Sequence, residues 1–180
     1  MTARDIRQSP GRALLLAGPL GSGKTCVAIA IGQLLDEART AHAVIDLDWL
    51  CWAGPELTAD QLTSMMVDNL AAVASRATLD GITTLVLARA VRSLDEVALL
   101  RAAVGGPLVA LRLSVPPEVV AARLRLRQDP DDPDSDAVAE TQARLHLPAV
   151  SNHGRPPIDT AREVLHRVGW LCEPTDMMGS

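Results

Sequence analysis

Short apolar runs alternate along the chain with longer segments whose apolar residues recur at helical spacing. Residues 13–17 form a continuous apolar run that ends at a glycine, which is typical of a strand buried on both faces. Residues 25–38 then carry apolar side chains spaced as on one face of a helix. The same alternation predicts strands at 42–47, 83–88, 108–113 and 147–151, and helices at 58–78, 93–104, 116–128, 136–145 and 157–168. Such alternation favours right-handed crossovers, and therefore an α/β fold with three layers, in which helices cover both faces of a five-stranded parallel sheet.

Two of these helices carry start signals. Thr58 with Gln61 resembles a capping box, and Ser93 with Glu96 has the same spacing. The helix at 58–78 shows one apolar stripe, formed by Leu62, Met66, Leu70 and Val73.

Composition narrows the class of protein. The chain has 180 residues, of which 48% are hydrophobic, and a formal net charge of -5. We therefore expect a single domain over residues 1–180, and no nucleic-acid partner because no basic footprint is evident. No apolar run reaches the length of a membrane span, and the polar start lacks a secretory signal, so we expect a cytoplasmic protein without membrane contact. The three cysteines form no CxxC pair, which argues against a disulfide framework or a structural zinc site.

A phosphate-binding loop lies between the first strand and the first helix. It fits G-x-x-x-x-G-K-[ST] at every fixed position, with the residues Gly18, Pro19, Leu20, Gly21, Ser22, Gly23, Lys24 and Thr25. Glycines let consecutive backbone N–H groups surround a di- or triphosphate, and the following helix contributes its positive end. Lys24, the only lysine of the chain, would reach the β- and γ-phosphates, and the Thr25 hydroxyl would bind Mg²⁺. The loop therefore predicts ATP and Mg²⁺ as cofactors.

Missing residues argue against two classes of P-loop protein. A GTPase reads guanine with an N-K-x-D element, which would need a second lysine. An AAA-type motor would end its third strand in Asp-Glu, but here Arg89 follows Ala88.

Two carboxylates, Asp46 and Asp48, end the second strand beside the predicted phosphate site. A carboxylate there can accept the proton of an attacking hydroxyl or help to hold Mg²⁺. The alternative is that either aspartate caps the loop that follows.

With these motifs the chain resembles the P-loop nucleotide and small-molecule kinases, particularly adenylylsulfate kinase and chloramphenicol phosphotransferase. The resemblance implies that Asp48 is the general base and that Asp46 supports the metal or the acceptor. Cys51 and Trp52 stand where adenylylsulfate kinase has the polar and basic residues that grip its substrate, which argues against sulfate activation.

The resemblance also implies a small lid around residues 123–140. Arg123 and Arg127 share a helix face and would reach the ATP when the lid closes, unless they form a solvated basic face. The loop at 151–156 resembles the segment that contacts adenine through its backbone in these kinases.

Three further side chains are candidates for binding the acceptor. Arg89 would meet an anionic part of it, with a surface salt bridge as the alternative. Trp49 and Trp52 would form an apolar wall, with core packing as the alternative.

These features predict a kinase that transfers the γ-phosphoryl group of ATP to a hydroxyl of a small molecule. A nucleotide kinase with a phosphate acceptor and a P-loop regulator with little turnover are the alternatives. The expected partners are ATP and a small-molecule acceptor, and the oligomeric state is left open, a homodimer included.

Overall fold

The computed structural model describes residues 11–51, 53–126 and 145–171 of the chain. Within them, the strands are β1 (Arg12–Ala17), β2 (His42–Asp46), β3 (Thr84–Arg89), β4 (Leu108–Ser114) and β5 (Ala149–Ser151). All pair in parallel, in the order β2-β3-β1-β4-β5. The predicted five-stranded parallel sheet is therefore confirmed, with β1 at its centre.

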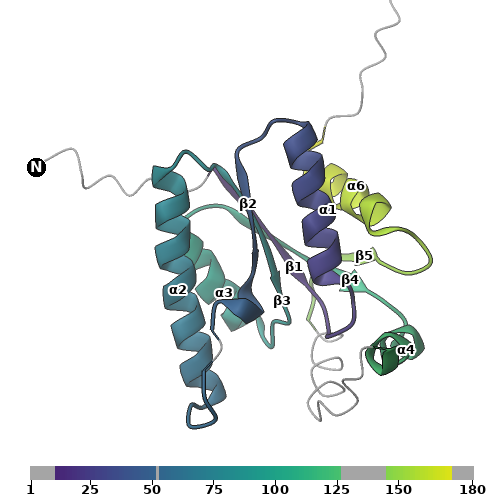
Figure 1. The fold of residues 1–180 in the computed structure, drawn as a ribbon, viewed down its shortest axis with the longest axis horizontal. Coiled ribbons are helices and arrows are strands. Elements are labelled where there is room, and N and C mark those ends of the chain that lie inside the picture. The colour runs from purple at the N-terminus through teal and green to yellow at the C-terminus, as the bar shows by residue number, and fades with distance from the viewer. Residues whose placement is uncertain (1–10, 52, 127–144, 172–180) are drawn as a thin grey trace, which may run out of the picture.

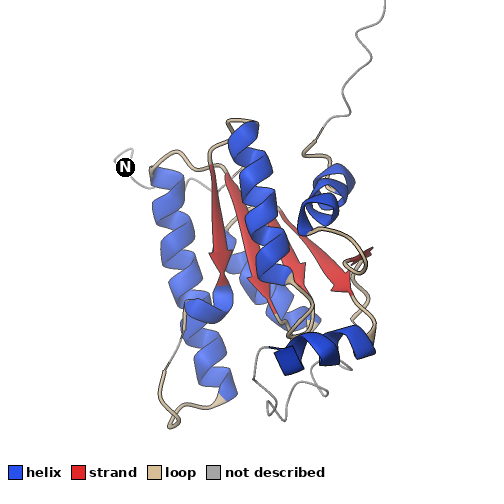
Figure 2. Cartoon of the chain, turned by 45° about the vertical axis from the view of Figure 1, so that its right-hand side comes forward, coloured by secondary structure: helices blue, strands red, loops and turns tan. Residues whose placement is uncertain are grey.

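Helices cover both faces of this sheet (Figure 1, Figure 2). They are α1 (Lys24–Glu37), α2 (Ala59–Leu79), α3 (Leu94–Val104), α4 (Pro117–Leu126) and α6 (Pro157–Arg167), with a 3₁₀ turn, η1 (Leu47–Trp49), after β2. Helices α1 and α6 pack against one face, and α2 and α3 against the other. The predicted three-layer α/β architecture is thus confirmed.

The central strand β1 supplies both cores, which explains why its sequence is apolar from Ala13 to Ala17. Leu14 and Leu16 face α1 and α6, whereas Leu15 and Ala17 face α2 and α3. All four side chains are fully buried. A strand with helices on both sides has no solvated face, so the polar alternation of a surface strand is missing.

The predicted helix starts have a structural basis. Thr58 and Gln61 form both hydrogen bonds of a capping box at the start of α2. Ser93 caps α3 by accepting a hydrogen bond from the Glu96 N–H at 3.1 Å. The predicted helix at 136–145 lies, except for its last residue, outside the described residues.

The buried stripe of α2 differs from the predicted one at its C-terminal end. Met66 and Leu70 are buried as expected, but Ala74 and Ala77 continue the stripe and Val73 is 36% exposed. The buried face of α2 is therefore continued by small alanines, and the larger Val73 lies outside it.

Because every strand of the sheet is parallel, the carboxyl ends of all strands lie at one edge. The phosphate loop follows β1, η1 follows β2, Arg89 ends β3, α4 follows β4, and the loop from Asn152 follows β5. This edge gathers the residues described below. Among the described residues, no helix combines the length and hydrophobicity that crossing a membrane would require.

Candidate active site

The phosphate loop connects β1 to α1 through glycines with unusual backbone angles. Gly23 is the N-cap of α1 and has a φ of 89°, in the left-handed region that favours glycine. A side-chain carbon at Gly23 would come within 2.6 Å of the Asn152 amide nitrogen. A carbon at Gly18 would come equally close to the Ser22 hydroxyl. The loop is therefore tightly packed from both sides, which explains why these positions need glycine.

Lys24 and Ser22 lie inside this loop. Lys24 is 6% exposed, and its Nζ donates to the Pro19 carbonyl at 3.0 Å. The hydroxyl of Ser22 is buried and has no hydrogen-bond partner among the described residues. An ammonium held over the loop and a spare hydroxyl within it are the donors that a phosphate chain would satisfy. The residues present thus fit an ATP triphosphate.

A pair of oxygen donors joins the start of α1 to the end of β2. The Thr25 hydroxyl donates to the Asp46 carboxylate at 2.7 Å. The other Asp46 oxygen accepts a 3.2 Å hydrogen bond from the Asp48 N–H, which caps η1. A hydroxyl and a carboxylate are hard oxygen ligands of the kind that Mg²⁺ prefers, so the two side chains fit a magnesium site. The capping role considered for Asp46 is also observed, and it uses only one of the two carboxylate oxygens.

Asp48 is held by an arginine at the end of the neighbouring strand. Arg89 Nη1 donates to Asp48 at 2.9 Å, and Arg89 Nε donates to Glu96 at 2.9 Å. Glu96 is only 6% exposed, and its second oxygen accepts from the Arg92 N–H at 2.7 Å. The Arg89 side chain is 17% exposed, so this ion pair lies largely beneath the surface. The salt bridge considered for Arg89 is present, and it connects to the candidate base.

The remaining predicted site residues are Trp49, Trp52 and Arg127. Trp49 belongs to η1 beside Asp48 and is 71% exposed, so it is not part of either core. Trp52 and Arg127 lie outside the described residues.

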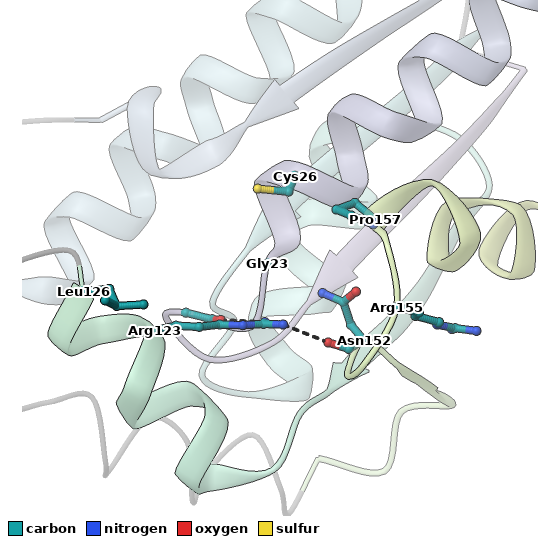
Figure 3. A pocket seen from close by; sticks show the side chains of 8 residues that line it. Gly23, Cys26, Arg123, Leu126, Asn152, Arg155 and Pro157 are labelled. Carbon is teal, nitrogen blue, oxygen red and sulfur yellow. Dashed lines mark hydrogen bonds between the residues drawn. The ribbon is translucent and has the colours of Figure 1, made fainter.

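Arg123 projects from α4 toward the phosphate loop and toward the loop after β5. Its guanidinium donates to the Gly21 carbonyl at 3.1 Å and to the Asn152 carbonyl at 3.2 Å, as Figure 3 shows. The Asn152 amide nitrogen in turn donates to the Ser22 carbonyl at 2.7 Å. Three segments that are distant in the sequence therefore meet here.

A pocket of about 320 Å³ opens between these segments. Its walls come from the phosphate loop, the start of α1, α4 and the β5–α6 loop (Figure 3), and the lining residues are Gly21, Gly23, Cys26, Arg123, Leu126, Asn152, Arg155 and Pro157. The pocket adjoins the phosphate loop and combines apolar surface with a guanidinium, which suits a planar heterocyclic base.

Solved structures with a similar fold are known. The chain matches gluconokinase from Sinorhizobium meliloti 1021 with a TM-score of 0.60 and 24% identity, covering 90% of this chain and 95% of that one. It matches the tunicamycin resistance protein of Deinococcus radiodurans with a TM-score of 0.65 and 18% identity, covering 91% and 99%. It matches APS kinase of Mycobacterium tuberculosis, solved with AMPPNP and APS, with a TM-score of 0.55 and 20% identity, covering 89% and 99%.

The chain has the fold of the P-loop kinases. The predicted resemblance to adenylylsulfate kinase is thereby confirmed at the level of the fold. No protein-family model matches the chain, and no curated protein matches it in sequence.

The structure adds two buried polar side chains to the site, those of Glu96 and Asn152. The sequence pattern does not single out either of them. Glu96 reads as the partner of a helix cap, but its carboxylate binds Arg89 and the Arg92 N–H. Asn152 falls in a loop expected to act through its backbone, yet its side chain, 4% exposed, binds the phosphate loop. The signal for Glu96 was a charged residue on the inward face of an amphipathic helix, and the signal for Asn152 was a polar residue directly after a strand.

Proposed function

We propose that the protein is a kinase that transfers the γ-phosphoryl group of ATP to a hydroxyl group of a small molecule. The observation that carries the proposal is the joint placement, at one edge of the sheet, of the Lys24 loop, the Thr25–Asp46 pair and the Asp48 carboxylate. A phosphate grip, a metal-binding oxygen pair and a proton acceptor are the three elements that phosphoryl transfer to a hydroxyl needs.

Two regions of the site would bind the two parts of ATP, its phosphates and its base. Residues 18–25 would hold the phosphates, with Lys24 placed for the β- and γ-phosphates. The base would enter the pocket bordered by Arg123 and the loop after β5. Arg127 would also contact the ATP when the lid around residues 123–140 closes. Exclusion of water by that lid would limit wasteful hydrolysis.

Thr25 and Asp46 are the residues that would hold Mg²⁺, directly or through water. When bound, Mg²⁺ supplies positive charge that offsets the charge of the phosphates. The Thr25 hydroxyl already points at the Asp46 carboxylate, so little rearrangement of the chain's own side chains is required.

Asp48 would remove the proton from the acceptor. As the acceptor oxygen bonds to the γ-phosphorus, the bond from that phosphorus to the β–γ bridging oxygen breaks, ADP leaves, and the hydroxyl proton passes to the Asp48 carboxylate. One Asp48 oxygen is held by Arg89, which fixes the direction of the carboxylate. We therefore assign Arg89 to positioning Asp48, and Trp49 to an apolar wall for the acceptor. An anionic acceptor group would have to compete with Asp48 and Glu96 for the Arg89 guanidinium.

The test is incubation with Mg²⁺, ATP and a panel of neutral alcohols, sugars, natural products and nucleoside monophosphates, followed by mass spectrometry. We expect a neutral hydroxyl compound to gain one phosphoryl group, and Asp48→Asn to lose that activity by about 10²-fold or more. Phosphorylation only of nucleoside monophosphates, with Asp48→Asn fully active, would instead identify a nucleotide kinase. ATP binding without any product would identify a regulator.

A further inference from the structure

The side chain of Asn152 is the centre of a buried hydrogen-bond chain that ends on the phosphate loop. Arg155 Nε donates to the Thr160 hydroxyl at 3.1 Å, and that hydroxyl donates to the Asn152 amide oxygen at 2.9 Å. The Asn152 amide nitrogen then donates to the Ser22 carbonyl at 2.7 Å. Thr160 and Ser22 are fully buried, and Asn152 is 4% exposed.

The direction of this chain fixes which way the amide points. The Ser22 carbonyl can only accept a hydrogen bond, so it needs the NH₂ of the Asn152 amide. The Thr160 hydroxyl, which accepts from Arg155, gives its one proton to the amide oxygen. If the amide of Asn152 were turned over, its NH₂ would face this proton and its oxygen would face the Ser22 carbonyl. The contact between the two oxygens would be repulsive, and the Thr160 proton would lose its acceptor, in a buried setting where unpaired polar groups are costly.

A fixed amide orients a peptide unit of the phosphate loop. In a planar trans peptide the C=O and the N–H point to opposite sides. Because Asn152 holds the Ser22 carbonyl toward the β5–α6 loop, the Gly23 N–H points away from that loop. Among the described residues, nothing accepts a hydrogen bond from this N–H. It therefore remains available for a phosphate oxygen, as the first N–H groups of a helix commonly do.

The preceding peptide, between Gly21 and Ser22, is also held through its carbonyl, by Arg123 of α4. Arg123 binds the Gly21 carbonyl with one nitrogen and the Asn152 carbonyl with another. Asn152 is thus tied to the loop through its side chain and to the lid arginine through its backbone. Its own N–H donates to the Ser114 carbonyl at 2.9 Å, which anchors it to the end of β4.

We infer that Asn152 is a positioning residue for phosphate binding, which sets the direction of the Ser22–Gly23 peptide and thereby presents the Gly23 N–H to the nucleotide. The inference rests on the proposed function, since it assumes that the loop binds ATP. Asn152 itself acts through the loop, and Thr160 acts through Asn152.

The test uses Asn152→Leu, which keeps the shape of the side chain and its neutrality but removes both hydrogen bonds. Thr160→Val keeps Asn152 but removes the donor to its amide oxygen, so one hydrogen bond holds the amide in place of two. The matched control is Asn69→Leu, because the exposed Asn69 amide also donates to a backbone carbonyl at 2.7 Å, that of Leu50, away from the phosphate loop. For each variant, calorimetry gives the Kd of ATP and of inorganic triphosphate without any acceptor, and urea titration gives the stability.

We expect Asn152→Leu to raise the Kd of ATP and the Kd of inorganic triphosphate by the same factor, about tenfold to a hundredfold. Thr160→Val should raise both by a smaller factor, about threefold to tenfold, and Asn69→Leu should leave both unchanged. A common factor for the two probes points to the phosphate loop, whereas a merely structural role would lower stability without this selective loss in the folded protein.

Wild-type affinity for triphosphate in folded Asn152→Leu would overturn the inference, as would a loss confined to ATP, which would place Asn152 against the base. If Asn152→Leu does not fold, Thr160→Val decides, and unchanged triphosphate binding in that variant overturns the inference. If the wild-type chain binds neither probe, the proposed function falls and the inference falls with it. Binding by the wild type with no change in either variant refutes the inference alone.

Discussion

Replacing Glu96 with Gln tests whether the Arg89 ion pair is a buried support of the site or an ordinary surface contact. Both Glu96 oxygens are used, one by Arg89 and one by the Arg92 N–H, and the residue is 6% exposed. Glutamine keeps the size of the side chain and one acceptor, but it removes the charge and presents an NH₂ where an acceptor is needed.

The size of the effect follows from this burial. Removing one partner of a buried ion pair typically costs about 3–5 kcal/mol. Arg89 retains Asp48 as a second carboxylate, and glutamine retains one hydrogen bond, so we expect a loss of about 2–3 kcal/mol. The kcat should fall about tenfold or more because Glu96 no longer fixes Arg89, and the Asp48 carboxylate that Arg89 holds is then less well oriented, while the Kd of ATP stays unchanged.

The control is Asp80→Asn at the C-cap of α2. Asp80 forms two 2.9 Å hydrogen bonds with Arg76, but the side chains are 49% and 74% exposed, so the expected cost is below about 1 kcal/mol. Urea denaturation of both variants and the wild type measures the free energy of unfolding. Equal losses for the buried and the exposed pair would refute the reasoning from burial, and an unchanged kcat in Glu96→Gln would refute the positioning of Asp48.

Three further predictions concern the loop, the metal and the pH. Gly23→Ala should cost about 1–2 kcal/mol of stability and weaken ATP binding, measured by calorimetry, because its φ of 89° and the Asn152 amide exclude a side-chain carbon. Thr25→Val should leave ATP binding in EDTA unchanged but abolish the gain that Mg²⁺ gives the wild type, and a full gain in the variant would contradict the assignment. The hydrogen bond from Arg155 lowers the pKa of Glu163 from its usual 4.5, so its stabilisation is present above pH 4.5 and is lost as the pH falls through the lowered value. Glu163→Gln should accordingly be less stable than the wild type at neutral pH in urea titrations, with the difference disappearing in acid; a constant difference would contradict this.

The features that were predictable from the sequence are encoded locally or by the rules of parallel sheets. The phosphate loop is a contiguous motif, so the positions of Lys24 and Thr25 follow from eight adjacent residues. That Thr25 and Asp46 lie at the same edge of the sheet also follows from the sequence, because the carboxyl ends of parallel strands share one edge, although their 2.7 Å contact does not.

The contacts that the sequence does not reveal join segments that are far apart. Asn152 binds the Ser22 carbonyl across 130 positions, and nothing near Asn152 in the sequence specifies that partner. The spacing of Ser93 and Glu96 is explained by the helix cap, in which the Ser93 hydroxyl accepts from the Glu96 N–H. That local explanation gives no sign that the Glu96 carboxylate also binds Arg89. The exposed position of Val73 shows the same limit in a helix, because packing between helices, and not side-chain size, selects the buried face.

The most direct test of a kinase acting on a hydroxyl is the chemical form of the transferred phosphorus. Once an acceptor is found, ³¹P NMR of a reaction containing Mg²⁺ and ATP should show a phosphomonoester that grows in step with ADP. Neither signal should grow appreciably with Lys24→Ala, since deleting a donor to the developing charge costs about 10²-fold or more. A phosphorylated acceptor that contains a new diphosphate linkage would contradict phosphoryl transfer to a hydroxyl. Formation of only inorganic phosphate and ADP would contradict it as well.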